Sequence, residues 1–234
     1  SIAFFFALGF LDRYAWLREF DQLPTVLRSA GVLMIVTGGI WAAFQRHLGR
    51  MMGYAAVVNI GFSLLALSLF QDYQLSAFFL LMVPQSLAIL VWSLSLSVLT
   101  LREGSLFFRE RQGDMYRFPI IIVGLIFAHF STLGLPLLAG FPPILATWGG
   151  VAEKTLSSAL WVAVGVASLL TGAIRTLAVV VMSPEKEDWA INGSLLQNIL
   201  IGVGIFFILI LGLFPQLMSP LLTKLPFVFS HLIG

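Results

Sequence analysis

The sequence predicts an all-α protein: a polytopic bundle of transmembrane helices in which one helix is discontinuous. Hydrophobic residues make up 59% of the 234 residues and charged residues only 10%, and the mean hydropathy is +0.99. Soluble domains are roughly 45–50% apolar and about 25% charged. The apolar residues form runs of about 20, the length that crosses a bilayer as a helix. One of these runs is interrupted by prolines and glycines.

Six runs are long enough to cross, and a shorter apolar segment after Ser1 counts as a partial span. The six are residues 26–44, 51–70, 75–100, 118–148, 158–182 and 194–214. We expect residues 1–218 to form one transmembrane bundle and residues 219–234, which contain two prolines, to form an interfacial tail. Because the chain opens on serine rather than methionine, we expect it to be the C-terminal part of a longer protein.

Charge is concentrated in three joints between the runs, at residues 46–50, 102–117 and 185–188. Alternate crossings place all three joints on one side, which carries more of the basic residues and is therefore predicted to be cytoplasmic. The 13 basic and 11 acidic residues form no patch that would bind nucleic acid. With no cysteine, no metal-ligand spacing and no catalytic motif, we expect neither a metal site nor catalytic residues in this chain.

The run at residues 118–148 contains the stretch STLGLPLLAGFPP. As one straight helix it would be about 46 Å long, well beyond a hydrocarbon core of ~30 Å. We therefore expect two half-helices joined around Gly134–Pro136, with a second irregularity at Gly140, Pro142 and Pro143. Carbonyl groups freed at this depth would have to face an internal polar path. The alternative is a proline kink packed against neighbouring helices.

Three stretches carry a family resemblance. Residues 131–141 read STLGLPLLAGF, residues 45–61 read QRHLGRMMGYAAVVNIG, and residues 211–215 read LGLFP. They resemble the S-L-A-G-I-P-P-L-A-G-F segment, the Q-x-D-L-K-R-L-L-A-Y-S-S-I-A-H-M-G segment and the closing G-x-F-P turn of the antiporter-like, proton-translocating membrane subunits of respiratory complex I. Together they correspond to roughly the C-terminal half of an N-type subunit. The resemblance implies a discontinuous helix beside a chain of polar residues that carries protons.

The resemblance also implies a function and its setting. The chain would be a membrane subunit of an NADH:quinone oxidoreductase, conducting protons coupled to electron transfer in partner subunits. No cofactor is expected in this chain; quinone and NADH, or another electron donor, would bind to partner subunits. Expected partners are other membrane and peripheral subunits and the lipid bilayer, in a bacterial inner membrane or an equivalent energy-converting membrane. Any enzymatic activity would belong to the whole assembly.

Departures from the family pattern keep alternatives open. Ile144 stands where N-type members carry a lysine, and Pro142–Pro143 replace a small or aromatic pair. Gly49 replaces a basic residue and Asn59 a membrane histidine. An apolar side chain cannot take up and release a proton. The alternatives are a structural subunit that does not conduct protons, the equivalent subunit of a cation/proton antiporter or membrane-bound hydrogenase, and an unrelated transporter with a broken helix.

Several polar residues inside the runs are candidates for a proton path. His129 can relay protons because imidazole titrates near neutral pH, or it is a neutral histidine bonded to nearby backbone or a serine. Ser131 lies beside the predicted break. Asn59 and Gln85 can carry water or bond across helices. Lys154, next to an acidic residue at the outer end of its run, is either a proton exit or part of a surface ion pair.

Arg175 is a permanent charge about 10 Å inside its run. The guanidinium is too basic to release a proton, so Arg175 cannot be a relay. It either snorkels to the membrane surface or points into the bundle, where it would act as an electrostatic gate. Antiparallel pairing of the two runs brings Arg175 near the depth of His129. We therefore expect its side chain to point toward His129 or Ser131.

Overall fold

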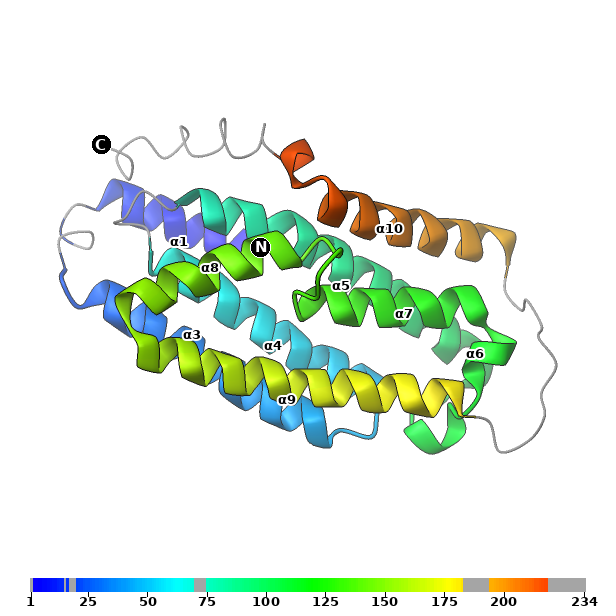
Figure 1. The fold of residues 1–234 in the computed structure, drawn as a ribbon. Helices are drawn as coiled ribbons and strands as arrows, with labels where there is room; N and C mark the ends of the chain where they lie inside the picture. Colours follow the sequence, from blue (N-terminus) through cyan, green and yellow to red (C-terminus); the bar gives the residue numbers. More distant parts are fainter. Residues whose placement is uncertain (1, 15, 17–19, 70–74, 183–193, 219–234) are drawn as a thin grey trace.

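The computed structural model describes residues 2–14, 16, 20–69, 75–182 and 194–218, most of which form a bundle of long helices (Figure 1). In order, the described elements are α1 (Ile2–Arg13), α3 (Leu23–Phe44), α4 (Leu48–Leu67), α5 (Leu75–Glu103), the 3-10 turn η2 (Phe108–Glu110), α6 (Asp114–Arg117), α7 (Pro119–Thr132), α8 (Phe141–Lys154), α9 (Leu156–Val181), α10 (Leu195–Leu213) and the 3-10 turn η3 (Pro215–Met218). The prediction of an all-α bundle is confirmed.

Five described helices are long and apolar enough to cross a membrane: α3, α4, α5, α9 and α10. The remaining predicted run is divided between α7 and α8, which have 14 residues each. Each would be about 21 Å long, shorter than the hydrocarbon core, so the two halves are needed for one crossing. The predicted partial span corresponds to α1. The predicted tail at residues 219–234 and the joint at residues 185–188 lie outside the described residues.

Local hydrogen bonds and prolines decide where the long helices begin. The ring Nδ1 of His47 accepts from the backbone N–H of Arg50 at 3.3 Å, so α4 begins at Leu48, before its apolar run. Ser194 and Gln197 form a capping box at the start of α10. Pro24 lies in the first turn of α3, where a missing N–H costs nothing. Three of the membrane helices thus begin at specific signals rather than where hydrophobicity begins.

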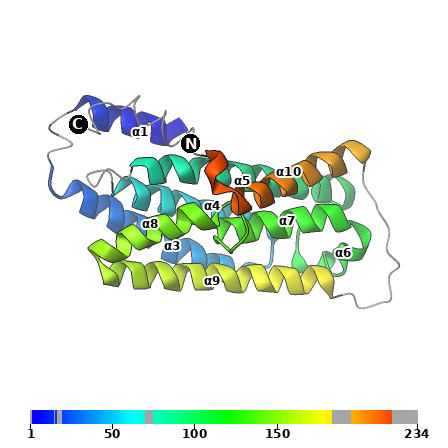
Figure 2. The ribbon, with the colours of Figure 1, turned by 45° about the horizontal axis from the view of Figure 1, so that its top comes forward.

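Helix α3 packs closely against two neighbours through paired glycines. A Cβ added at Gly31 would lie 2.8 Å from the carbonyl oxygen of Gly61 on α4. A Cβ added at Gly39 would overlap the carbonyl oxygen of Gly165 on α9. Figures 1 and 2 both show α3 beside α9. Small residues let helix backbones approach in a membrane, where hydrophobicity alone does not drive helices together.

Helices α5 and α7 pack against each other, and α10 covers both of them. Figure 2 shows α10 and α9 on opposite sides of the bundle. The outward face of α10 is apolar, with Leu196, Ile199, Val203 and Phe206 each about half exposed or more. This face suits contact with lipid or with another apolar surface.

The charged joints before α4 and after α5 meet at one end of the bundle. The backbone N–H of Leu48 donates to the carbonyl oxygen of Leu106 at 3.0 Å, and that of Phe108 donates to Arg46 at 2.9 Å. These bonds make the antiparallel bridge between residues 47 and 107. The two described joints therefore lie on the same side, as predicted. That this side is cytoplasmic stays a prediction.

The joint between α5 and α7 is held by a buried ion pair. The guanidinium of Arg111 donates to the carboxylate of Asp114 at 3.1 Å, with the side chains 2% and 0% exposed. Arg117 adds a second positive charge at 3.8 Å from the same carboxylate. Removing one partner of a buried pair leaves an uncompensated charge, so each depends on the other. The joint is thus a packed part of the fold.

The Gly39–Gly165 contact generates a first prediction. Gly39→Ala should lower the thermal unfolding midpoint of the detergent-purified protein, because an added methyl group must push α3 and α9 apart; overpacking of this kind costs about 1–3 kcal/mol. Gly202→Ala on α10 is the control, because a Cβ there meets no atom within 4 Å. Equal midpoints for the two variants would show that the α3–α9 contact is looser than the structure has it.

Candidate functional site

The break in the broken helix begins with a Schellman motif at the end of α7. The N–H of Leu135 donates to the carbonyl oxygen of Phe130 at 3.2 Å, and the N–H of Gly134 donates to Ser131 at 3.1 Å. Gly134 has φ +68°, the left-handed conformation that this motif requires and glycine adopts without strain. Pro136 lies two residues after Gly134 and prevents the helix from continuing. The predicted break at Gly134–Pro136 is confirmed.

The second predicted irregularity, at Gly140, Pro142 and Pro143, is instead the start of α8. The two prolines occupy the first turn of α8, where prolines are tolerated. The N–H of Gly140 donates to the hydroxyl of Ser131 at 3.2 Å. The N–H of Phe141 donates back to a carbonyl within the break at 3.0 Å. Hydrogen bonds therefore connect residues 133–140 to the end of α7 and to the start of α8.

Apolar contacts close the break on two sides. Ile144 is 4% exposed, and its side-chain carbons lie 3.0–3.1 Å from the position that a Cβ on Gly134 would take. Leu137 has φ 72°, which is strained for a residue with a side chain. Its carbonyl oxygen lies against Gly212, where a Cβ on α10 would overlap it. At the position of the family's lysine, this chain therefore has a buried aliphatic contact.

His129 lies fully buried on α7, next to the break. Its ring stacks against Trp92 on α5, with the ring centroids 4.3 Å apart and the planes 31° from parallel. Neither ring nitrogen of His129 has a hydrogen-bond partner among the described residues. The indole N–H of Trp92 has none there either. Buried polar groups are usually paired, so these unpaired atoms make the His129–Trp92 pair a candidate site.

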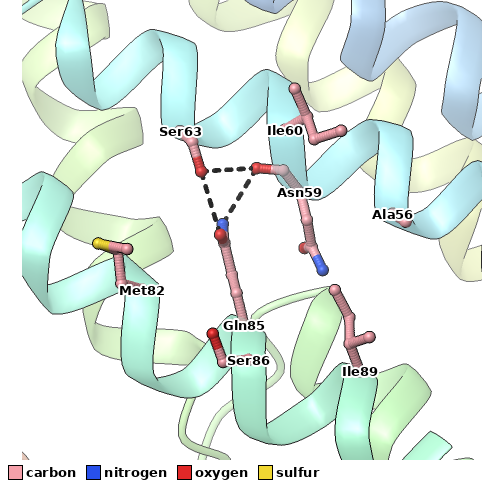
Figure 3. A pocket seen from close by; sticks show the side chains of 8 residues that line it. All are labelled: Ala56, Asn59, Ile60, Ser63, Met82, Gln85, Ser86 and Ile89. Atoms are coloured by element: carbon pink, nitrogen blue, oxygen red, sulfur yellow. Dashed lines mark hydrogen bonds between the residues drawn. The ribbon is translucent and has the colours of Figure 1, made fainter. Parts of the chain in front are cut away.

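Asn59 and Gln85 meet beside a cavity of about 200 Å³ between α4 and α5 (Figure 3). The side-chain amide of Gln85 donates to the backbone carbonyl of Asn59 at 3.1 Å. The hydroxyl of Ser63 lies 3.1 Å from both that carbonyl and the Gln85 carbonyl oxygen. A hydroxyl has one proton, so it can donate to only one of these acceptors at a time. The side chain of Asn59 points into the cavity and has no partner in the described part of the chain.

The cavity and the His129 pair lie along the same face of α5. Gln85, Ile89 and Trp92 follow one another at helical spacing, and Ile89 lines the cavity. The distance along the helix from Gln85 to Trp92 is about 10 Å at 1.5 Å per residue. The structure therefore places the predicted residues in two neighbouring centres, Asn59 with Gln85 and His129 near Ser131.

Arg175 does not join these centres. Its guanidinium donates to the carbonyl oxygen of Ala43 in the last turn of α3 and lies 5.8 Å from the ring centre of Phe108. The predicted direction toward His129 or Ser131 is wrong. The last carbonyls of a helix have no partner within it and carry the negative end of its dipole, and an aromatic ring attracts a cation. The Ala43 carbonyl and the Phe108 ring therefore hold the Arg175 guanidinium at the end of the bundle where the charged joints meet.

Lys154 lies exposed in the last turn of α8, far along the chain from the break. Its role as an exit stays a prediction.

Three residues of the two centres were not predicted from the sequence: Ser63, Ser86 and Trp92. Helical spacing was the available signal, because Ser63 lies one turn after Asn59 and Trp92 two turns after Gln85 on the same faces.

Comparisons with known proteins agree with the fold. The transmembrane family described as "NADH:quinone oxidoreductase/Mrp antiporter, TM" matches residues 3–178. The chain belongs to this family. NADH-quinone oxidoreductase subunit N of Dehalococcoides mccartyi is 25% identical over 232 residues, covering 95% of this chain and 46% of that protein. Subunit N of Acinetobacter baumannii is 25% identical over 213 residues, covering 87% and 43%. The chain thus spans about half the length of these relatives.

Solved structures show the same fold. A chain of respiratory complex I from Thermus thermophilus with bound NADH has a TM-score of 0.79 at 19% identity, covering 97% of this chain and 49% of that one. A chain of the membrane-bound sulfane sulfur reductase, an archaeal respiratory membrane complex, has a TM-score of 0.82 at 20% identity, covering 98% and 46%. These complexes have several subunits, so relatives with this fold work in assemblies. The transmembrane family and the five apolar helices show that the chain is an integral membrane protein.

Ser131 should stabilise the break through its hydroxyl. Ser131→Ala leaves the buried N–H of Gly140 without its partner, which should cost about 1–3 kcal/mol and lower the thermal unfolding midpoint. Thr132→Ala is the matched control, because the Thr132 hydroxyl only donates to the carbonyl of His129, which also accepts from the backbone N–H of Leu133. A larger loss for Thr132→Ala than for Ser131→Ala would contradict this account of the break.

Arg175 should act on stability rather than on transport. Arg175→Met keeps the apolar stem but removes the bond to Ala43, and bonds to charged groups contribute about 1.5–3 kcal/mol. The thermal unfolding midpoint should fall in Arg175→Met. It should fall less in Arg175→Lys, because an ammonium group still donates a hydrogen bond. Proton transport per electron should stay unchanged in both variants. Reduced transport at an unchanged midpoint would restore the gate interpretation.

Proposed function

We propose that this chain forms part of a proton-translocating membrane subunit in a complex I-type quinone oxidoreductase. Electron transfer in partner subunits drives protons through it. Those partners are other membrane and peripheral subunits, and they bind the quinone and NADH or another electron donor. The setting is a bacterial inner membrane or an equivalent energy-converting membrane.

The position of His129 is the observation that carries this proposal. It is fully buried next to the helix break, and neither ring nitrogen has a hydrogen-bond partner among the described residues. Within the described membrane helices, no histidine or carboxylate other than His129 lies away from the helix ends. A buried ionisable group in a membrane helix is costly and marks a functional site.

The amide cavity supplies the second part of the path. Asn59 and Gln85 cannot release a proton, but their side chains and the Ser63 hydroxyl can orient water, and about 200 Å³ accommodates several water molecules. His129 on α7 then holds the proton beside Trp92, which lies about 10 Å further along α5 than Gln85. Ser131 lies beside it at the break, and Lys154 is the candidate exit at the outer end of α8.

A structural subunit that does not conduct protons is the second candidate. Ile144 packs against Gly134 where the family resemblance implies a lysine, and Asn59 replaces a histidine. Both changes remove groups that could exchange a proton. This candidate predicts that His129 only fills space beside Trp92.

Related assemblies share the fold. A chain of the Mrp complex from Dietzia sp. DQ12-45-1b has a TM-score of 0.76 at 16% identity, so the equivalent subunit of a cation/proton antiporter or of a membrane-bound hydrogenase is also compatible with this architecture. The genes that neighbour this one would separate these assemblies, because each requires different partner subunits.

The deciding experiment replaces His129 in the full-length subunit within its complex. His129→Phe keeps an aromatic ring against Trp92 but cannot carry a proton, and we expect fewer protons moved per electron pair at an unchanged thermal midpoint. The measurement uses proteoliposomes with a pH-sensitive dye and a simultaneous electron-transfer assay. Trp92→Phe is the packing control and should pump normally. Full pumping by His129→Phe would favour the structural subunit.

A further inference from the structure

The closing stretch LGLFP at residues 211–215 brings the end of α10 against the break in the broken helix. Gly212 lies in the last turn of α10. A Cβ added there would overlap the carbonyl oxygen of Leu137 and would lie 2.5 Å from the carbonyl carbon of Leu138. Both atoms belong to the backbone, which cannot turn aside as the end of a flexible side chain can. Only glycine therefore lets the end of α10 come this close to the break.

Helix α10 reaches the break along one narrow stripe of its surface. Its buried residues are Ile201, Gly204 and Ile208, and Gly212 follows them at the same helical spacing. Ile201 lies against α7, and Gly204 lies against α5. The stripe that fastens α10 to these two helices thus ends on the backbone of the break.

Leu137 has a backbone conformation that glycine usually adopts. Its φ of 72° is left-handed, and the other described residues with a positive φ are all glycines. The N–H of Leu138 donates to the carbonyl oxygen of Leu135 at 3.3 Å, so Pro136 and Leu137 are the central residues of a turn. A turn with proline first and a positive φ second is of type II, which favours glycine at the second place. The Leu137 side chain is 62% exposed, so its own packing does not hold this strained conformation.

The carbonyl oxygen of Leu137 is a second unfavourable feature of this turn. Among the described residues, no group donates a hydrogen bond to it. In the interior of a membrane a carbonyl has no water to bond. Its position against the bare Cα of Gly212 is that of a Cα–H···O contact, a kind that recurs where helices pack closely. Gly212 thus meets both the strained residue and its open carbonyl.

We propose that Gly212 is a positioning residue for the break. The end of α10 closes over the Leu137 carbonyl and holds the turn at residues 135–138 in its left-handed conformation. Two residues after this turn, the N–H of Gly140 donates to the Ser131 hydroxyl at 3.2 Å. Gly212 therefore acts on Ser131 through the backbone of the break and touches no proton itself. Its effect on transport rests on the proposed function, whereas its effect on the conformation of the break does not.

Hydrogen–deuterium exchange in the assembled complex, with the full-length subunit, tests this conformation directly. Gly212→Ala should speed amide exchange across residues 135–141 by about tenfold or more, because the added methyl group pushes the turn away from α10 and opens its hydrogen bonds. Exchange is followed by mass spectrometry of peptic peptides. Gly202→Ala on α10 is the matched control, since a Cβ there meets no atom within 4 Å, and it should exchange as the unchanged protein does.

A second variant separates positioning from packing. Leu137→Gly, added to Gly212→Ala, should restore slow exchange, because glycine keeps a positive φ without strain and its backbone can yield to the methyl group. Faster exchange along the whole of α10 that Leu137→Gly does not restore would overturn the proposal in favour of loosened packing. Unchanged exchange at residues 135–141 in Gly212→Ala would overturn it as well. If Gly212→Ala alone does not assemble, assembly of the double variant supports the proposal, and failure of both contradicts it.

Proton transport per electron pair is measured on the same samples. It should fall in Gly212→Ala and recover in the double variant. Faster exchange at the break with normal transport would support the positioning role of Gly212 and contradict the part that the proposed function gives to the break. The two proposals can therefore fail separately.

Discussion

The architecture depends on one constraint: backbone groups in the interior of a membrane have no water to bond. Residues 133–140 meet this constraint in a helix that has to stop halfway. The Schellman bonds from the N–H groups of Gly134 and Leu135 satisfy the carbonyls of Ser131 and Phe130. The Ser131 hydroxyl accepts a hydrogen bond from the N–H of Gly140. Because many of these groups are paired, the break can lie next to apolar surfaces such as Ile144 and the end of α10.

The polar side chains near the break are almost all neutral. Arg175 is drawn to the end of α3, and the buried Arg111–Asp114 pair lies in the joint at the same end. At mid-depth in the described helices, the remaining polar side chains include an imidazole, two amides and several hydroxyls. Neutral groups of this kind bind and orient water without the desolvation cost of a charge. The bundle separates its permanent charges, at the ends, from its hydrogen-bonding groups, at the centre.

The hydrophobic runs were enough to predict the spans, and the helix-breaking residues Gly134 and Pro136 were enough to predict the break. Both features follow from local chemistry. The meeting of Asn59 with Gln85 could be suspected from their amide character but not located, since it depends on how α4 and α5 cross. Arg175 was misplaced because depth alone was used, whereas its partners, Ala43 and Phe108, come from a helix end and a joint distant in sequence. The irregularity predicted at Gly140, Pro142 and Pro143 is the start of α8, because proline at a helix start and within a helix look alike in sequence.

The division of one crossing into α7 and α8 has a consequence for biosynthesis. Neither half is long enough to be recognised alone as a span, so the insertion machinery must accept both together, with a turn in the middle of the segment. The hydrogen bonds of the turn join residues at most nine positions apart. These bonds can therefore form before any later helix has been synthesised.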